Sequence, residues 1–187
     1  RCSRDWSSDV CSSDLRQVES DSPNCVGAWN AAARTSRGHI LVQVSDDFTP
    51  PMGWDIQIMD AISRAGKSPA DSVVVAVSDG HRKDDLLCIT ICSRARYRQQ
   101  GGELFAREYE GVFSDNEFSY RAWRDGVVID ARDRMMFTHA HPFFDKSVPI
   151  DATYAKQNSI ERYREGRRTF LLRNPELEAL RWAGGEQ

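Results

Sequence analysis

The sequence predicts an α/β fold in which helices flank a mixed β-sheet. Three short apolar runs, residues 40–44, 72–77 and 86–92, are rich in β-branched side chains and typical of buried strands. Segments with a helical period lie between and after these runs, and two shorter strands follow later in the chain. Early alternation of strands and helices favours parallel pairing, and the late strand pair favours a mixed edge to the sheet.

The elements of the first half follow one another closely. Residues 26–34 are rich in alanine and predict a helix, for which Gly38 is a suitable stop signal. The run 40–44 is predicted as a buried parallel strand, and the prolines and glycine in residues 49–53 indicate a turn. Apolar side chains then recur every four residues, which predicts an amphipathic helix over residues 54–65.

The second half contains shorter elements. After the strands 72–77 and 86–92, residues 94–100 are polar and predict one or two helical turns. Residues 115–124 place apolar side chains at helical spacing and predict a longer helix. Two short strands are predicted at residues 127–129 and 135–138, joined as a hairpin around residues 131–133.

The first residues of the chain resemble something other than protein. Residues 5–15 match one reading frame of a common short-read sequencing adapter at all eleven positions. We therefore expect residues 1–15 to be an adapter-derived, disordered artefact, and the remainder to be a metagenomic fragment of a longer protein. The predicted division is a partial α/β domain over residues 16–150 and a C-terminal helical extension over residues 151–187, with Asp151 as a candidate N-cap.

Composition excludes several classes of protein. Leaving out residues 1–15 removes two basic and three acidic residues, so 23 basic residues stand against 25 acidic ones. This balance argues against a basic nucleic-acid binder, and no apolar run is as long as a membrane span. The remaining cysteines, Cys25, Cys88 and Cys92, are odd in number and form no CxxC pair, which argues against a disulfide scaffold or zinc knuckle. A reducing cytoplasm is the expected location.

Four polar clusters fall at the ends of predicted apolar elements. Ligands of open α/β sheets bind beyond the carboxyl ends of the strands, and paired carboxylates there can hold a hard divalent cation. Taken singly, each cluster has a simpler explanation as a helix cap, a turn, a solvated first-turn acid or a structural histidine pair. The clusters are Ser45-Asp46-Asp47, Asp79-Gly80-His81, Ser114-Asp115-Asn116-Glu117 and His139-Ala140-His141-Pro142.

The order of these motifs resembles the family-two glycosyltransferases of the GT-A fold. The resemblance extends over residues 25–142 and implies a GT-A-like (Rossmann-like) mixed sheet flanked by helices, with the N-terminal strands of the family missing. The residues that carry it are Asn30-Ala31-Ala32, Gly38, Ser45-Asp46-Asp47, Pro51, Gly53-Trp54, Gly101-Gly102, Asp115-Asn116-Glu117, Arg121, Gly126 and His139.

The resemblance implies a metal site that binds a nucleotide-sugar. Asp47 matches the last aspartate of the family's DxD motif, which binds Mn²⁺ or Mg²⁺. Asp46 matches the middle position, which contacts the ribose or sugar of the donor. His139 matches the histidine that completes the metal or phosphate site, and His141 is a close rival that the sequence does not separate from it.

The resemblance also implies the catalytic residues. Asp115 matches the general base that takes a proton from the acceptor hydroxyl, and a modestly raised pKa would suit that role. Glu117 is assigned with it to the catalytic set, and Asn30 and Arg121 to donor binding. The implied activity is inverting, metal-dependent transfer of a sugar from a nucleotide-sugar donor to a hydroxyl of a carbohydrate or other acceptor.

The sequence departs from the family pattern in three places. Ser45 stands where many relatives have a first aspartate, and residues 103–105 differ from the family's usual Phe-Asp-Glu. The strands that hold the nucleoside base are not recognisable before residue 40, so the fragment itself is expected to be inactive if they are needed.

Two other functions remain open. The pair His139 and His141 resembles the HxH entry of metallohydrolases, although only 46 residues follow His141, too few for a barrel. A non-catalytic carbohydrate-binding or phage structural module is the second alternative. The transferase hypothesis predicts that Asp47, Asp115 and His139 converge on one cleft, whereas a binding module predicts that they are scattered.

Overall fold

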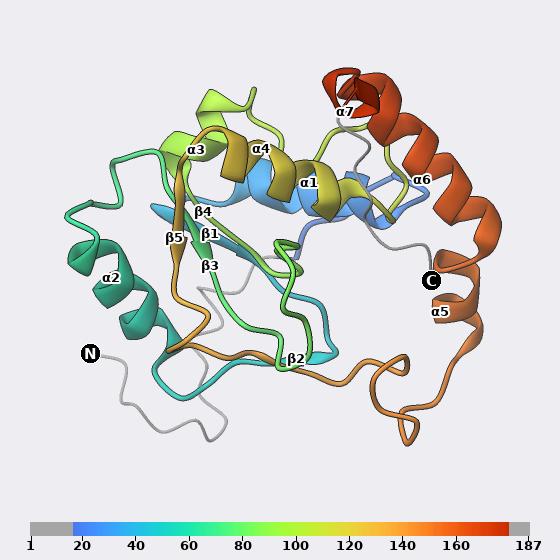
Figure 1. The fold of residues 1–187 in the computed structure, drawn as a ribbon, viewed down its shortest axis with the longest axis horizontal. Coiled ribbons are helices and arrows are strands. Elements are labelled where there is room, and N and C mark those ends of the chain that lie inside the picture. The colour runs from blue at the N-terminus through green and yellow to red at the C-terminus, as the bar shows by residue number, and fades with distance from the viewer. Residues whose placement is uncertain (1–16, 180–187) are drawn as a thin grey trace.

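Four strands form the central sheet of the computed structural model, which describes residues 17–179 (Figure 1). The predicted adapter segment therefore lies outside the described residues. The strand order is β1-β4-β3-β5, and the strands are β1 (Ile40–Gln43), β4 (Thr90–Ser93), β3 (Val74–Ala76) and β5 (Val128–Asp130). Since β4 is antiparallel to both β1 and β3 while β5 is parallel to β3, three strands run one way and β4 the other. The predicted mixed α/β architecture is confirmed.

Two predictions about strand pairing are wrong. The strand at residues 40–44 was expected to be buried and parallel, but β1 lies at an edge of the sheet and pairs antiparallel with β4. The predicted hairpin of residues 127–138 does not form, because β5 pairs with β3 and the second segment pairs elsewhere. That segment is β6 (Thr138–His139), which forms a separate two-stranded sheet with β2 (Phe48–Thr49).

Side chains of β3 alternate between two hydrophobic cores, one on each face of the sheet. Val74 and Ala76 pack with α1 (Cys25–Thr35) and α4 (Ser114–Arg124). Val73, Val75 and Val77 pack on the other side with Ile58 and Ile62 of α2 (Trp54–Arg64). Figure 1 shows α1 and α4 on one side of the strands. The sheet is thus the middle of three layers.

The C-terminal helices pack against the same core as α4. Phe170 of α6 (Ile160–Arg173) and Leu177 of α7 (Glu176–Ala179) are buried there. Asp151 caps α5 (Ala152–Gln157), as predicted, by accepting a 2.7 Å hydrogen bond from the backbone N–H of Tyr154. The remaining helix, α3 (Arg94–Gln99), begins at the end of β4. Among residues 17–179, the helices are too short or too polar to cross a membrane.

Candidate functional site

The small β2–β6 sheet brings Asp47 and His139 together from positions 92 residues apart. Phe48 pairs with His139 in this sheet, and Asp47 immediately precedes Phe48. A backbone hydrogen bond of 2.8 Å from the N–H of Ala140 to the carbonyl oxygen of Asp47 extends the pairing. Asp47 also follows the carboxyl end of β1, so the pair lies at the edge of the central sheet where the sequence predicted a site.

The His139 imidazole is held between an aromatic ring and a carboxylate. Its Nε2 lies 3.1 Å from Oδ2 of Asp47, and its ring stacks on Phe48 with 3.9 Å between centroids. The histidine side chain is only 10% exposed. Oδ1 of Asp47 and Nδ1 of His139 are buried without a hydrogen-bond partner within residues 17–179. Buried polar atoms are usually satisfied, so these two atoms are exceptions, as are Oγ1 of Thr90 and Nε of Arg96 and Arg121 elsewhere in the described residues.

A third side chain, Asp79, completes what we call the Asp47–His139 cluster: Asp47, Asp79 and His139. Asp79 follows the carboxyl end of β3 and is buried. Because β1 and β3 run in the same direction, their carboxyl ends bring Asp47 and Asp79 to the same edge. Oδ2 of Asp79 lies 3.9 Å from Nδ1 of His139. The imidazole therefore has a carboxylate near each of its two nitrogens.

His141 is turned to different partners. Its Nδ1 accepts a 3.2 Å hydrogen bond from the backbone N–H of Phe143, and its Nε2 lies 3.1 Å from the hydroxyl of Tyr154. Burial lowers the pKa of His141 below its ordinary value, and His139 lowers it further. Both ring nitrogens of His141 are thus engaged by other groups, which favours His139 as the candidate ligand, although the two imidazole rings are in edge contact with 4.7 Å between their centroids.

Asp115 lies on another element, in the first turn of α4. Its carboxylate accepts a hydrogen bond from the N–H of Asn116, and burial raises the pKa of Asp115. The preceding Phe113 has a φ of 74°, a left-handed conformation that costs energy for a residue with a side chain and is found at functional sites. Within the described residues, no hydrogen bond or ion pair joins Asp115 to Asp47 or His139. The backbone N–H of Arg82 donates to Asp79, and the charge of Arg82 offsets a small part of the rise in the pKa of Asp115 that burial causes.

Glu117 belongs to a different group, which we call the Glu117 cluster: the buried Glu117 and Tyr109, and the partly exposed Arg121 and Arg173. Arg173 donates to both carboxylate oxygens, at 2.8 Å and 3.1 Å for the shortest bond to each. Tyr109 donates its hydroxyl proton at 2.5 Å, and Arg121 forms an ion pair at 2.6 Å. The predicted catalytic role of Glu117 and the donor-binding role of Arg121 do not fit this position, because these side chains tie α4 to the C-terminal helices.

Asn30 is also placed in the interior. Its Oδ1 accepts hydrogen bonds from the N–H groups of Leu104 and Phe105, and its Nδ2 donates to the carbonyl oxygen of Phe105. The side chain is 1% exposed, so it stabilises the loop of residues 101–113 against α1 and has no free atom for a donor. Asp46, in contrast, is exposed beside Asp47, a position compatible with the contact to a ribose or sugar that was predicted for it.

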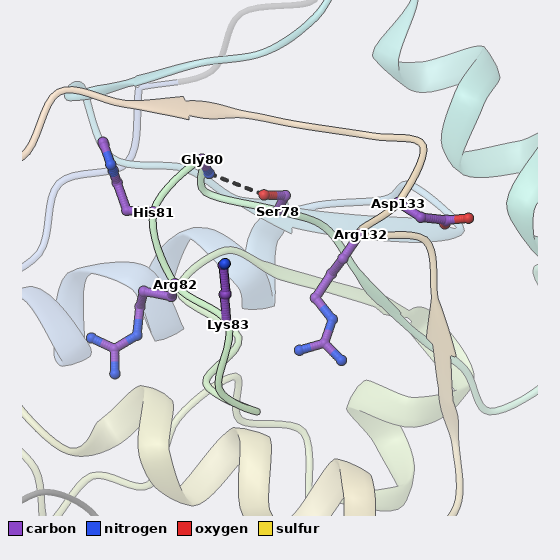
Figure 2. Close-up of a pocket in the computed structure, with 7 residues that line it drawn as sticks. All are labelled: Ser78, Gly80, His81, Arg82, Lys83, Arg132 and Asp133. Atoms are coloured by element: carbon purple, nitrogen blue, oxygen red, sulfur yellow. Dashed lines mark hydrogen bonds between the residues drawn. The ribbon is translucent and has the colours of Figure 1, made fainter.

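A hollow of about 360 Å³ lies next to the cluster, on the loop that follows β3. Figure 2 shows Lys83 between Arg82 and Arg132, with His81 and Asp133 at the two ends of the view. Arg82 is paired with Asp84, and Arg132 with Asp130. Lys83 forms no ion pair in the part of the chain that the structure describes. His81 links the hollow to the cluster, because its Nε2 lies 3.0 Å from the carbonyl oxygen of His139.

The Asp47–His139 cluster fits one kind of metal better than another. Within residues 17–179, no group of three or more His, Cys, Asp or Glu side chains is arranged to hold an ion. A closed structural site, which needs four protein ligands, is therefore a poor fit. Mg²⁺ and similar ions, however, bind through one or two protein ligands plus water and substrate phosphates. The unpartnered Oδ1 of Asp47 beside Nε2 of His139 fits such an open site.

Sequence reasoning assigned no role to Asp79 or His81, although Asp79 belongs to the cluster and His81 contacts it. The available signal was the position of Asp79-Gly80-His81 at the end of a buried strand, the same signal that selected Asp47. Their contacts with His139 depend on residues 78–79 running beside residues 136–139, a long-range pairing that no local pattern indicates.

Comparison of the chain with protein-family models, with curated proteins and with solved structures finds no match.

Proposed function

We propose that the chain is part of a metal-dependent, inverting glycosyltransferase that moves a sugar from a nucleotide-sugar to an acceptor hydroxyl. The observation that carries this proposal is the contact between Asp47 and His139, whose Oδ2 and Nε2 are 3.1 Å apart at the edge of the sheet. The family resemblance assigns the metal to Asp47 and to His139 or its rival His141, and the fold brings Asp47 and His139 together across 92 positions.

Asp47 and His139 would hold Mn²⁺ or Mg²⁺ through a carboxylate oxygen and Nε2. When bound, such a cation stabilises the negative charge that builds on a departing diphosphate. Asp46, which is exposed beside Asp47, would contact the ribose or sugar of the donor. The cationic hollow next to the cluster supports binding of an anionic substrate, and Lys83 has a charge there that no acidic side chain of the described residues neutralises.

Asp115 would act as the general base. As the acceptor oxygen attacks the anomeric carbon, its proton passes to the Asp115 carboxylate, and the bond from the anomeric carbon to the diphosphate oxygen breaks. A base works best when its pKa lies close to the working pH, and burial shifts the pKa of Asp115 upward in that direction. A single base that activates an external acceptor implies inversion at the anomeric carbon.

The test is turnover of nucleotide-sugars by the chain with its reading frame extended upstream, since the fragment itself is expected to be inactive if the N-terminal strands of the family are needed. We expect Mn²⁺-dependent release of nucleoside diphosphate from at least one donor of a panel that varies both base and sugar. Asp47→Ala should abolish this release, whereas Asp55→Ala, an equal change at an exposed position in the first turn of α2, should not. The proposal is contradicted if no donor is turned over, or if Asp47→Ala and Asp55→Ala behave alike.

A further inference from the structure

Asp79 is a buried carboxylate to which the proposed reaction gives no role. Its side chain is 5% exposed, in the loop between β3 and the cationic hollow. Its two oxygens have different neighbours. Oδ1 accepts hydrogen bonds from the N–H groups of His81, at 2.9 Å, and Arg82, at 2.8 Å. Oδ2 faces Nδ1 of His139 at 3.9 Å and the Cys88 sulfur at 3.9 Å.

The ring of His139 needs an acceptor on this side. Nδ1 is buried and has no hydrogen-bond partner within residues 17–179; if a cation takes the electron pair of Nε2, the imidazole proton is on Nδ1, where an unsatisfied buried N–H costs about 1–3 kcal/mol. Oδ2 of Asp79 is the carboxylate oxygen that faces it. The separation of 3.9 Å exceeds a hydrogen bond, but contacts of this kind are often long in the unliganded state and shorten when the ligand binds.

We infer that Asp79 is a positioning residue, which accepts the Nδ1 proton of His139 in a hydrogen bond when a cation replaces the proton that Nε2 shares with Asp47 in the unliganded chain. The inference rests on the proposed function, because it concerns the metal site of that function. Histidine ligands commonly donate their second ring N–H to a carboxylate, which fixes both tautomer and ring orientation.

Backbone N–H groups of the loop fix the orientation of the Asp79 carboxylate. The N–H groups of His81 and Arg82 hold Oδ1, so the carboxylate cannot rotate freely and Oδ2 is the atom left to face the imidazole. Stacking on Phe48 fixes the ring from the other side. Rotamers of both partners are therefore constrained before any ligand arrives, which is what a preorganised site requires.

Asp79→Asn is the most informative variant, because it changes the chemistry at almost constant shape. The amide oxygen can keep the hydrogen bonds from His81 and Arg82, and the amide NH₂ then faces Nδ1 of His139. That NH₂ is a donor, so it selects the tautomer with the proton on Nε2, which cannot bind a cation. Asp71→Asn is the matched control, since Asp71 also accepts from a backbone N–H, at Ser68, but precedes β3 at the opposite end of the strand.

The experiment measures Mn²⁺ affinity of the full chain from the electron paramagnetic resonance signal of free Mn²⁺. We expect Asp79→Asn to weaken binding about 10–100-fold and Asp71→Asn to leave it unchanged. Equal affinity of Asp79→Asn and the unmodified chain would overturn this inference alone. Failure of the unmodified chain to bind Mn²⁺ would overturn the proposed function together with it.

A second measurement tests the tautomer of His139 directly, and its first part uses only the unmodified chain. In the unmodified chain loaded with diamagnetic Zn²⁺, ¹⁵N–¹H correlation spectra should show His139 with its proton on Nδ1 and the metal on Nε2. At the same Zn²⁺ concentration, folded Asp79→Asn should keep the proton on Nε2, which lies 3.1 Å from Asp47 in the unliganded chain, whereas Asp71→Asn should give the spectrum of the parent. Zn²⁺ on Nδ1 in the unmodified chain would overturn the inference.

Discussion

The Asp47–His139 cluster and the Glu117 cluster are both built from residues far apart in the sequence, yet their carboxylates differ in one respect. Both oxygens of Glu117 are bonded, to Arg173, Tyr109 and Arg121. Asp47, in contrast, has one buried oxygen without a partner within residues 17–179, while its other oxygen lies 3.1 Å from Nε2 of His139. A satisfied buried carboxylate stabilises the fold, whereas an unsatisfied one leaves binding capacity for a ligand.

The same difference separates two acids within one helical turn. Asp115 and Glu117 both lie in the first turn of α4, where the helix dipole favours acidic residues. Glu117 faces the C-terminal helices and forms the ion pair with Arg173. Asp115 accepts a hydrogen bond only from the neighbouring N–H of Asn116 within the described residues, and burial raises its pKa. Glu117 is thus a structural acid, whereas Asp115, two residues earlier in the same turn, is a candidate base.

The largest expected effect comes from breaking the Glu117 cluster. Glu117→Ala removes the acceptor of the buried Tyr109 hydroxyl and the buried partner of Arg173, which keeps Glu108, so we expect the unfolding free energy to fall by about 3 kcal/mol, the lower end for a broken buried pair. Urea denaturation followed by circular dichroism measures this loss. Glu176→Ala, which removes an exposed acid that contacts Tyr120, should change stability little. Equal losses in the two variants would show that the Glu117 cluster is not structural.

Asp115→Asn should increase stability, in contrast to Glu117→Ala, and should strongly reduce activity. Loss of a general base lowers transfer by about 100-fold or more. Since burial raises the pKa of Asp115, the folded state favours the protonated form, and the stability from this group is lost as the pH rises through the raised pKa. The neutral amide avoids that loss, so the variant should be more stable than the parent at pH 7.5 and match it near pH 3.

Denaturation at several pH values, combined with donor turnover, measures both effects of Asp115→Asn. A variant that is less stable at pH 7.5 but fully active would place Asp115 with the structural acids.

A smaller loss of stability is expected for Asn30→Ala. The substitution leaves the N–H groups of Leu104 and Phe105 without their acceptor, which costs about 1–3 kcal/mol. Affinity for Mn²⁺ should not change, because Asn30 lies in the interior. Thermal unfolding and Mn²⁺ titration of the variant, beside the exposed control Asn158→Ala, measure the two quantities. Weaker Mn²⁺ binding at unchanged stability would show that Asn30 takes part in the binding site.

The smallest effect is expected for His141→Gln. The variant loses the contact between His141 and Tyr154, worth about 0.5–1.5 kcal/mol of stability, and should bind Mn²⁺ as the parent does. Calorimetric titration with Mn²⁺ compares it with His139→Gln, which should bind far more weakly. If the order of the two variants is reversed, the ligand is His141.

The sequence predicts the mixed α/β class and the helices well, because these depend on local periodicity and on stop signals such as Gly38. Strand partners were harder to predict. β1 pairs antiparallel with β4 at an edge, and residues 138–139 leave β5 to pair with β2, although the local patterns of these strands allow other pairings. The direction of β1 and β3 nevertheless brings Asp47 and Asp79 to one edge, which is why the strand-end rule selected useful residues.

Within the site, sequence reasoning identified positions better than roles. Alternation places His139 and His141 on one face of an ideal strand, but β6 ends at His139, so His141 turns to Phe143 and Tyr154. The role of Glu117 was misjudged because Arg173, its main partner, is 56 residues away. The role of Asp79 depends on a backbone pairing with the residues before His139. All three depend on long-range contacts.

The central claim is that a divalent cation binds between Asp47 and Nε2 of His139. Electron spin echo modulation of the Mn²⁺-loaded chain, with ¹⁵N-labelled histidine, tests it most directly, because it detects histidine nitrogens bound to Mn²⁺ among the four histidines of the chain. We predict coupling to one histidine nitrogen that disappears in His139→Gln and persists in His141→Gln. Bound Mn²⁺ without histidine coupling, or coupling that survives in His139→Gln, would contradict the account.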